Sequence, residues 1–318
     1  MTQQAVLVTG ASGFVGAALI LRLCGRTDIS LTAASRNINQ EWPAGVKYLH
    51  LTDLEADHVA IPLDGVDTIV HCAARVHVMS DQASDPVSVF RKINVHATLN
   101  LARQAAIAGV RRFVFISSIK VNGEATIAGS YFYPSDEPAP EDPYAISKLE
   151  AEHGLMRLGN DTGMEVVIIR PPLVYGPGVK GNFASLIKLM AKGIPLPLGA
   201  IYNKRSLVGI DNLVDLIMRC IDHPAAANQV FLAGDGEDLS TTELLRSVAE
   251  VMGQPARLIP IPVGLLSLGA TLLGKQEVAR RLLGSLQVDI SKAREVLGWK
   301  PPVSVKEGLR RCVRDSSV

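Results

Sequence analysis

Short, uniformly apolar runs alternate with stretches of helical periodicity along the first half of this chain. The runs AVLVTG (residues 5–10) and FVFIS (residues 113–117) lack the polar residue at every second position that is typical of a strand with one solvent-exposed face. Strands buried on both faces are typical of parallel sheets covered by helices. The pattern predicts an α/β fold, a doubly wound parallel sheet with helices on both sides.

The same reading assigns elements along the chain. The expected strands are 5–10, 29–35, 66–74, 111–118 and 164–172. A strand followed by a helix is expected within 206–222, and a further strand at 229–234. The expected helices are 14–24, 89–109 and 144–158.

Proline and glycine become frequent after Arg170, as in PPLVYGPG and GIPLPLG. We expect residues 1–170 to form a dinucleotide-binding domain, with 206–235 returning to it. Residues 171–205 and 236–318 should form a smaller, interleaved substrate-binding region.

Composition excludes several classes of function. The net charge is +1, from 32 basic and 31 acidic residues without long runs, which predicts no nucleic-acid partner. The cysteines are far apart without CxxC spacing, so neither disulfides nor a metal site is expected and a reducing, cytoplasmic setting fits; they are Cys24, Cys72, Cys220 and Cys312. The N terminus resembles no signal peptide. The uncharged segment 258–274 is shorter than the ~20 residues that span a bilayer, so we expect a packed or partly interfacial element without stable membrane insertion.

A glycine-rich loop follows the first expected strand and opens the first expected helix. Glycines there permit a tight turn and a close approach of backbone N–H groups to a pyrophosphate, which the helix N terminus favours. Glycines also serve any sharp turn, so the context of strand, loop and helix carries the prediction. The expected dinucleotide contacts are Gly10, Ser12, Gly13, Phe14, Val15 and Gly16.

The end of the second strand predicts which dinucleotide is bound. An acid at this position would accept the ribose 2′-hydroxyl of NAD, but the chain has Ser35 and Arg36. A hydroxyl and a guanidinium can hold a 2′-phosphate, which favours NADP(H) over NAD(H); the alternative is a solvated arginine in a loop.

Tyr144 and Lys148 lie four residues apart in YAISK, on one face of the expected helix. An ammonium beside a phenol stabilises the phenolate and lowers a pKa that is otherwise about 10. The pair therefore predicts a tyrosine that exchanges a proton with a carbinol or carbonyl oxygen, with Lys148 also able to bind a nicotinamide ribose.

Five motifs in order now resemble those of one family: TGASGFVG, HCAA at 71–74, Asn94, the Ser117–Ser118 strand end and YAISK. The chain is similar to the extended short-chain dehydrogenases/reductases, in the NAD-dependent epimerase/dehydratase group that acts on nucleotide sugars. The resemblance implies that Ser118 binds the reacting oxygen, that Tyr144 is the acid/base and that Lys148 is its partner.

The resemblance also implies further contacts. Asn94 would steady the active-site helix and Asp53 would contact adenine. Arg205 would clamp the substrate diphosphate, with a second clamp from Arg280 or Arg281, and Asn182 would lie against the nucleotide. The remaining implied cofactor contacts are Leu54, Ala73, Ala74, Ser117 and Pro171.

Several reactions are open to such a site. A hydrolase is disfavoured because no GxSxG elbow surrounds Ser118. A dehydratase is disfavoured because Ile119 and Lys120 stand where the family's dehydratases carry Asp-Glu. We expect an NAD(P)H-dependent reductase of UDP-4-keto-6-deoxy-hexosamines in O-antigen precursor synthesis. The alternatives are a UDP-hexose or UDP-N-acetylhexosamine 4-epimerase and a non-catalytic nucleotide-binding sensor. The resemblance further implies a homodimer formed through two helices of the large domain.

Overall fold

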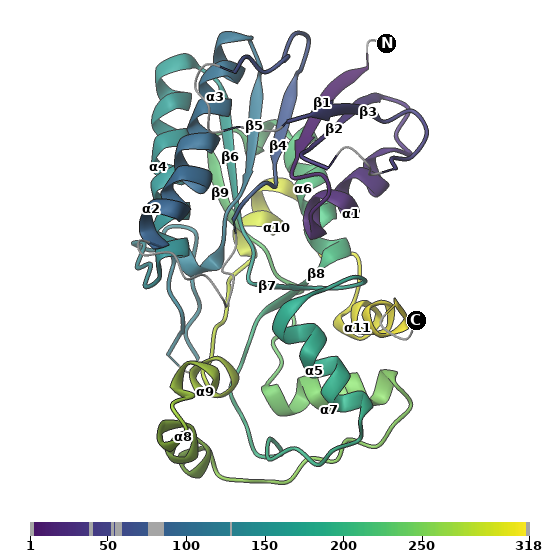
Figure 1. Cartoon of the computed structure of the whole chain (residues 1–318), viewed down its shortest axis with the longest axis vertical. Coiled ribbons are helices and arrows are strands. Elements are labelled where there is room, and N and C mark those ends of the chain that lie inside the picture. Colours follow the sequence, from purple (N-terminus) through teal and green to yellow (C-terminus); the bar gives the residue numbers. More distant parts are fainter. Residues whose placement is uncertain are drawn as a thin grey trace.

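The computed structural model describes residues 3–37, 41–51, 54, 59–75, 86–127 and 129–315. Seven parallel strands form the main sheet in the order β3-β2-β1-β4-β5-β6-β9 (Figure 1). They are β1 Gln4–Thr9, β2 Ile29–Ser35, β3 Lys47–His50, β4 Thr68–His71, β5 Arg112–Ile116, β6 Glu165–Arg170 and β9 Gln229–Leu232. The predicted fold class is confirmed.

Helices cover both faces of this sheet, as the uniformly apolar strands require. One face packs on α1 (Phe14–Leu23), α6 (Ile210–Asp222) and α10 (Ser291–Leu297). The other packs on α3 (Ala97–Ile107) and α4 (Pro143–Thr162), and α2 (Pro86–Arg91) lies beside α4.

The helix expected over 89–109 is not continuous. A π-helical turn, η1 (Lys92–His96), separates α2 from α3. Such turns often occur at functional sites because they change the direction in which side chains point. Asn94, one of the predicted site residues, lies in this turn.

A second lobe lies below the carboxyl ends of the main strands in Figure 1. Its two-stranded sheet pairs β7 (Leu173–Tyr175) with β8 (Leu207–Gly209). A separate apolar core joins α5 (Gly181–Ala191), α7 (Thr241–Val251) and α11 (Val305–Asp315).

Two segments depart from the expected division of the chain. Within 206–235, β9 joins the main sheet and α6 packs on it, but β8 pairs with β7 in the separate two-stranded sheet. Within 236–318, α10 and Trp299 pack into the core of the large domain. The two parts are therefore more interleaved than the sequence pattern indicates.

The uncharged segment 258–274 forms α8 (Val263–Leu272), followed by α9 (Gln276–Leu283). The two helices contact each other, but neither contains a fully buried residue, so the packed alternative of the prediction does not hold and the partly interfacial one stays open. No helix within the described part of the chain is both long and apolar enough to cross a bilayer.

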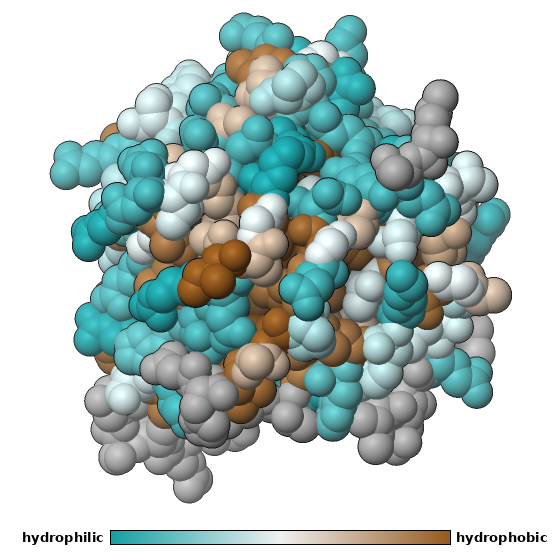
Figure 2. Space-filling model, turned by 90° about the horizontal axis from the view of Figure 1, so that it is seen from above, coloured by the Kyte–Doolittle hydropathy of each residue, from teal (hydrophilic) through white to brown (hydrophobic). Residues whose placement is uncertain are grey.

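The opposite end of the molecule, where the main strands begin, is seen from above in Figure 2. Hydrophilic side chains form most of its outline, and hydrophobic ones gather near its centre. A shallow polar hollow at this end includes Arg26, which pairs with Asp222 at 2.6 Å. In sheets of this kind ligands bind at the carboxyl ends of the strands, so the candidate site is expected at the opposite edge of the sheet.

Candidate active site

The strand order reverses between β1 and β4, and the glycine loop lies at this switch point. Gly10 has φ +65°, and a Cβ there would lie 2.5 Å from the backbone nitrogen of Ala73, directly after β4. A Cβ on Gly16 would lie 2.2 Å from the carbonyl oxygen of Gly10. Both glycines are required by close backbone approaches, one between two strand ends and one between loop and helix.

The loop fits a pyrophosphate. No side chain caps the N terminus of α1, where Gly13 is the N-cap residue in an extended conformation. The first N–H groups of a helix have no intrahelical acceptor, and with the helix dipole they favour an anion. Ser12 is exposed beside them, and Ala73 and Ala74 are half-buried across the loop.

The residues expected to bind the adenosine end of the cofactor differ in their surroundings. The Ser35 hydroxyl forms a local turn, accepting from the Asn37 backbone nitrogen and donating to its carbonyl, both at 3.2 Å. Arg36 is exposed. Asp53 lies outside the described residues, and Leu54 packs against the core on the α3–α4 face.

His71 is held between two threonines at the end of β4. Its Nδ1 lies 2.7 Å from Thr9 Oγ1 and its Nε2 lies 3.0 Å from Thr98 Oγ1. Burial, and then the charge of Lys148, lowers the pKa of His71 to about 3. A neutral, doubly bonded imidazole links β1, β4 and α3 and is unsuited to act as a base near neutral pH.

Ser118 and Tyr144 meet beyond the end of β5. Ser118 caps the short turn η2 (Ile119–Val121) by accepting from the backbone nitrogen of Lys120 at 3.3 Å. Burial raises the pKa of Tyr144 to about 12, a hydrogen bond with Ser118 lowers it, and the charge of Asp142 raises it. The predicted serine and tyrosine are therefore in direct contact.

Lys148 is fully buried one turn further along α4. Its Nζ donates to the carbonyl oxygen of Ile116 at 2.7 Å and lies 4.2 Å from the centre of the Phe115 ring. Burial lowers the pKa of Lys148 to about 8, against the charge of Glu152. The expectation that Lys148 lowers the pKa of Tyr144 is not met in this arrangement, since burial dominates and Ser118 supplies the opposing effect.

Asn94 ties the loop after β4 to the catalytic helix. Its amide nitrogen donates to Ser147 Oγ at 3.0 Å and to the carbonyl of Arg75 at 3.1 Å, while its oxygen accepts from the Arg75 nitrogen at 2.8 Å. These contacts place Asn94 where an asparagine that steadies the active-site helix is expected.

A buried ion pair next to the site was not predicted from the sequence. Arg170, at the end of β6, donates to both carboxylate oxygens of Glu152 on α4, the shortest contact being 2.5 Å. The Ser117 hydroxyl donates to the same carboxylate, and Arg170 also reaches Asn122 at 3.0 Å. Pro171 follows, and its carbonyl accepts from the nitrogen of Ile119 at 2.9 Å. The available signal was a glutamate four residues after Lys148, on the same helix face.

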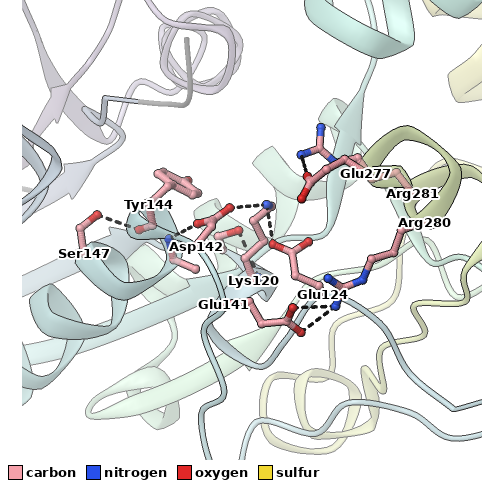
Figure 3. A network of polar contacts seen from close by, with 11 residues as sticks. Lys120, Glu124, Glu141, Asp142, Tyr144, Ser147, Glu277, Arg280 and Arg281 are labelled. Atoms are coloured by element: carbon pink, nitrogen blue, oxygen red, sulfur yellow. Dashed lines mark hydrogen bonds and ion pairs between the residues drawn. The ribbon is translucent and has the colours of Figure 1, made fainter. Parts of the chain in front are cut away.

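Lys120 bridges two acids in front of the catalytic helix (Figure 3). Its Nζ lies 2.6 Å from a carboxylate oxygen of Glu124 and 2.6 Å from one of Asp142. Asp142 also caps α4 by accepting from the nitrogen of Ala145 at 2.7 Å. Lys120 thus joins η2 to the first turn of the helix that carries Tyr144.

The expected diphosphate clamps lie on the second lobe. Arg205 donates to the carbonyl of Gly284 at 3.1 Å. Burial lowers the pKa of Arg205, with Glu124 raising and Arg281 lowering it, so these two charges lie close to Arg205. Arg280 is instead paired with Glu141 at 2.6 Å, just before α4 (Figure 3). Asn182 is exposed in the first turn of α5.

Known proteins are similar to this chain in sequence and in fold. The family model described as NAD dependent epimerase/dehydratase family matches residues 6–234. A UDP-glucose 4-epimerase of Vibrio cholerae is 50% identical over 97% of this chain and 94% of its own length. A GDP-6-deoxy-D-mannose reductase of Pseudomonas aeruginosa is 27% identical over 99% of this chain and 97% of its own.

The fold comparison agrees. The structure of a Bacillus cereus UDP-glucuronic acid 4-epimerase in complex with NAD superposes with a TM-score of 0.79, at 21% identity and over 99% of both chains. The matched family model, the fold and the predicted motifs coincide, and the chain belongs to the NAD-dependent epimerase/dehydratase family of extended short-chain dehydrogenases/reductases.

Proposed function

We propose that the protein is a 4-epimerase of UDP-hexoses or UDP-N-acetylhexosamines. The observation that carries this proposal is the 50% identity to a UDP-glucose 4-epimerase along 97% of the chain. The sequence motifs favoured a 4-ketoreductase, and the 4-epimerase was the alternative. The relative outweighs that preference because motifs shared by both reactions cannot separate them.

Ser118 and Tyr144 supply the proton chemistry. A nicotinamide dinucleotide held by the glycine loop would supply reversible hydride exchange at sugar C4, which inverts this carbon if the hydride returns to the other face of the sugar. Tyr144 removes the proton from the C4 hydroxyl and later gives it back, while Ser118 donates a hydrogen bond to the same oxygen. Lys148 is proposed to bind the nicotinamide ribose from its buried position one turn further along α4.

Epimerisation also requires that the keto sugar rotate in the site and present its opposite face, while its nucleotide stays bound. Arg205 and Arg281 are proposed to hold the diphosphate, because the positive charge of Arg281, which also pairs with Glu277 at 3.2 Å, lowers the pKa of Arg205. Arg280 is assigned a tethering role through Glu141. Asn182 is proposed to contact the nucleotide from α5.

A dehydratase is disfavoured by more than the sequence pattern. Lys120 occupies the position of a dehydratase carboxylate, and its ammonium is committed to Glu124 and Asp142. Elimination of water would need an additional acid/base pair at this place.

A 4-ketoreductase of UDP-4-keto-6-deoxy-hexosamines is the second candidate. It is supported by the 27% identity to a nucleotide-sugar reductase over 99% of the chain. The two activities share Ser118, Tyr144 and Lys148 and differ in whether oxidised cofactor leaves the protein.

One assay separates them. The purified protein is incubated with UDP-glucose or UDP-N-acetylglucosamine, and the C4 configuration is followed by NMR while nicotinamide absorbance is recorded. The epimerase interconverts the C4 epimers without net change in cofactor. Stoichiometric oxidation of NADH or NADPH with a UDP-4-keto-6-deoxy sugar, and no turnover of the parent sugars, would establish the reductase instead.

Cofactor preference, assembly and location extend the proposal. Arg36, exposed after β2, supports NADP(H) over NAD(H). The contributions of Asp53, Leu54, Ala73, Ala74, Ser117 and Pro171 to cofactor binding stay predictions. A cytoplasmic homodimer formed through helices of the large domain stays a prediction as well.

A further inference from the structure

An exposed apolar helix projects from the second lobe. Of its side chains, Leu265, Leu268 and Leu272 are 61%, 58% and 79% exposed, and they recur at i, i+3 and i+7 on one face. Leu273, at 74%, extends this stripe. A Cβ on Gly264 would meet nothing within 4 Å, so open space also surrounds the start of the helix.

The helix is firmly held at both ends of its hairpin. Before α8, Leu258 bridges Leu196, and Ile259 accepts from the nitrogen of Gly199 at 2.9 Å. After α9, the carbonyl of Gly284 accepts from Asn203 at 2.7 Å. The α8–α9 hairpin, residues 263–283, is therefore an anchored projection at the lower left of Figure 1.

Charge is distributed unevenly around it. Residues 258–274 carry no charge, whereas the flanks carry four basic residues and one acidic residue: Arg257, Lys275, Arg280, Arg281 and Glu277. Arg280 pairs with Glu141 and Arg281 with Glu277, so the positive charge next to the uncharged segment comes from Arg257 and Lys275. Arg257 and Lys275 are exposed at the two ends of the uncharged segment.

We propose that the α8–α9 hairpin docks on the surface of an anionic phospholipid membrane, with the α8 leucine stripe in the headgroup region. A helix of ten residues is about 15 Å long, half of a hydrocarbon core, so it lies on a bilayer rather than spanning it. Apolar side chains flanked by basic ones are typical of interfacial helices, and lysine and arginine favour anionic headgroups.

Docking would also bring the candidate site close to the bilayer. Arg280 pairs with Glu141, next to the Asp142 cap of α4, so α9 is tied to the catalytic helix. The hairpin itself contains none of the residues assigned to proton transfer.

The test is flotation of the full-length protein with vesicles of phosphatidylglycerol and phosphatidylethanolamine, against vesicles of phosphatidylcholine alone. We expect flotation with the anionic vesicles and its loss at high salt. Leu268→Gln/Leu272→Gln should reduce binding at least about tenfold, because two buried leucines are removed from the interface. Lys275→Glu should weaken it selectively on anionic vesicles.

Leu21→Gln is the matched control, since Leu21 is 66% exposed on α1, in the large domain, and should leave flotation unchanged. Sugar turnover in solution by the leucine variant should match that of the wild type, which verifies folding. The proposal is overturned if the wild type does not float. It is also overturned if light scattering shows that the wild type forms an assembly that the leucine variant does not form, and if the wild type does not bind vesicles. The leucine stripe would then contact a second copy of the chain.

Discussion

At the scale of single residues, the site depends on how neighbouring charges balance around one phenol. Burial and Asp142 both raise the pKa of Tyr144, which holds the proton more tightly than catalysis near neutral pH requires. Lys120 neutralises Asp142 through a 2.6 Å ion pair. The pKa of Tyr144 therefore depends on Lys120, which acts on it through Asp142; no hydrogen bond between Lys120 and Tyr144 is found among the described residues.

Lys120→Met is expected to move the tyrosine limb of the pH–rate profile upward by about half to one pH unit. The variant leaves Asp142 and Glu124 uncompensated; negative charge disfavours the phenolate, so the pKa rises and the rate at neutral pH falls. Lys120→Arg should behave as the wild type.

The control is Asp142→Asn, because asparagine still caps a helix but carries no charge. Adding Lys120→Met to Asp142→Asn should shift the limb by much less. A uniform loss of rate at every pH would show that Lys120 only holds η2 in place, and a raised KM alone would show that it contacts substrate.

Arg36 carries the predicted cofactor preference by itself, because the Ser35 hydroxyl is engaged in a local turn. Arg36→Gln should weaken NADPH binding about tenfold, the loss of one charge-assisted phosphate contact, and leave NADH binding nearly unchanged. Fluorescence titration of both cofactors measures this ratio. Equal effects on both would remove the basis for an NADP preference.

At the scale of elements, the junction of β1 and α1 is specified by backbone packing. Gly16 lies in the first turn of α1, and any side chain there meets the carbonyl of Gly10. The loop geometry that presents N–H groups to an anion therefore depends on the absence of one carbon atom.

Gly16→Ala should lower cofactor affinity at least about tenfold, because the 2.2 Å contact forces the helix away from the loop. Gly25→Ala is the matched control, since a Cβ there meets nothing within 4 Å. Calorimetric titration with cofactor compares the two. Unaltered affinity in Gly16→Ala would show that the loop adapts without loss of function.

At the scale of the whole molecule, Arg112 joins the two halves of the chain. It is 1% exposed, and its Nη1 donates to the carbonyls of Cys220, Ile221 and His223 at the end of α6, at 2.7–2.9 Å. Its Nε pairs with Glu165 at 2.7 Å. One buried guanidinium thus connects β5 to a helix more than 100 residues later.

Arg112→Met is expected to lower the free energy of unfolding by about 3–5 kcal/mol, because a buried pair is broken and three carbonyls lose their donor. Arg111→Met, which removes an exposed partner of the same Glu165, should cost about 1 kcal/mol or less. Urea denaturation measures both. Equal losses would contradict this division between buried and exposed arginines.

Local patterns identified much of this protein from its sequence. The apolar runs predicted the parallel sheet because burial on both faces excludes polar residues, and the glycine loop, Ser118 and YAISK lie near one another at the strand ends because parallel strands all end at one edge. These are properties of single elements, which neighbouring residues determine.

Other features of the site arise from contacts between elements that are distant in sequence. The π turn at Asn94, the Glu152–Arg170 pair and the bridging of Lys120 to Asp142 depend on side chains brought together from separate strands and helices. The exposure of α8 is of the same kind, since an apolar helix is buried only if another surface covers it. Periodicity shows which face of an element is apolar; packing alone determines what, if anything, lies against it.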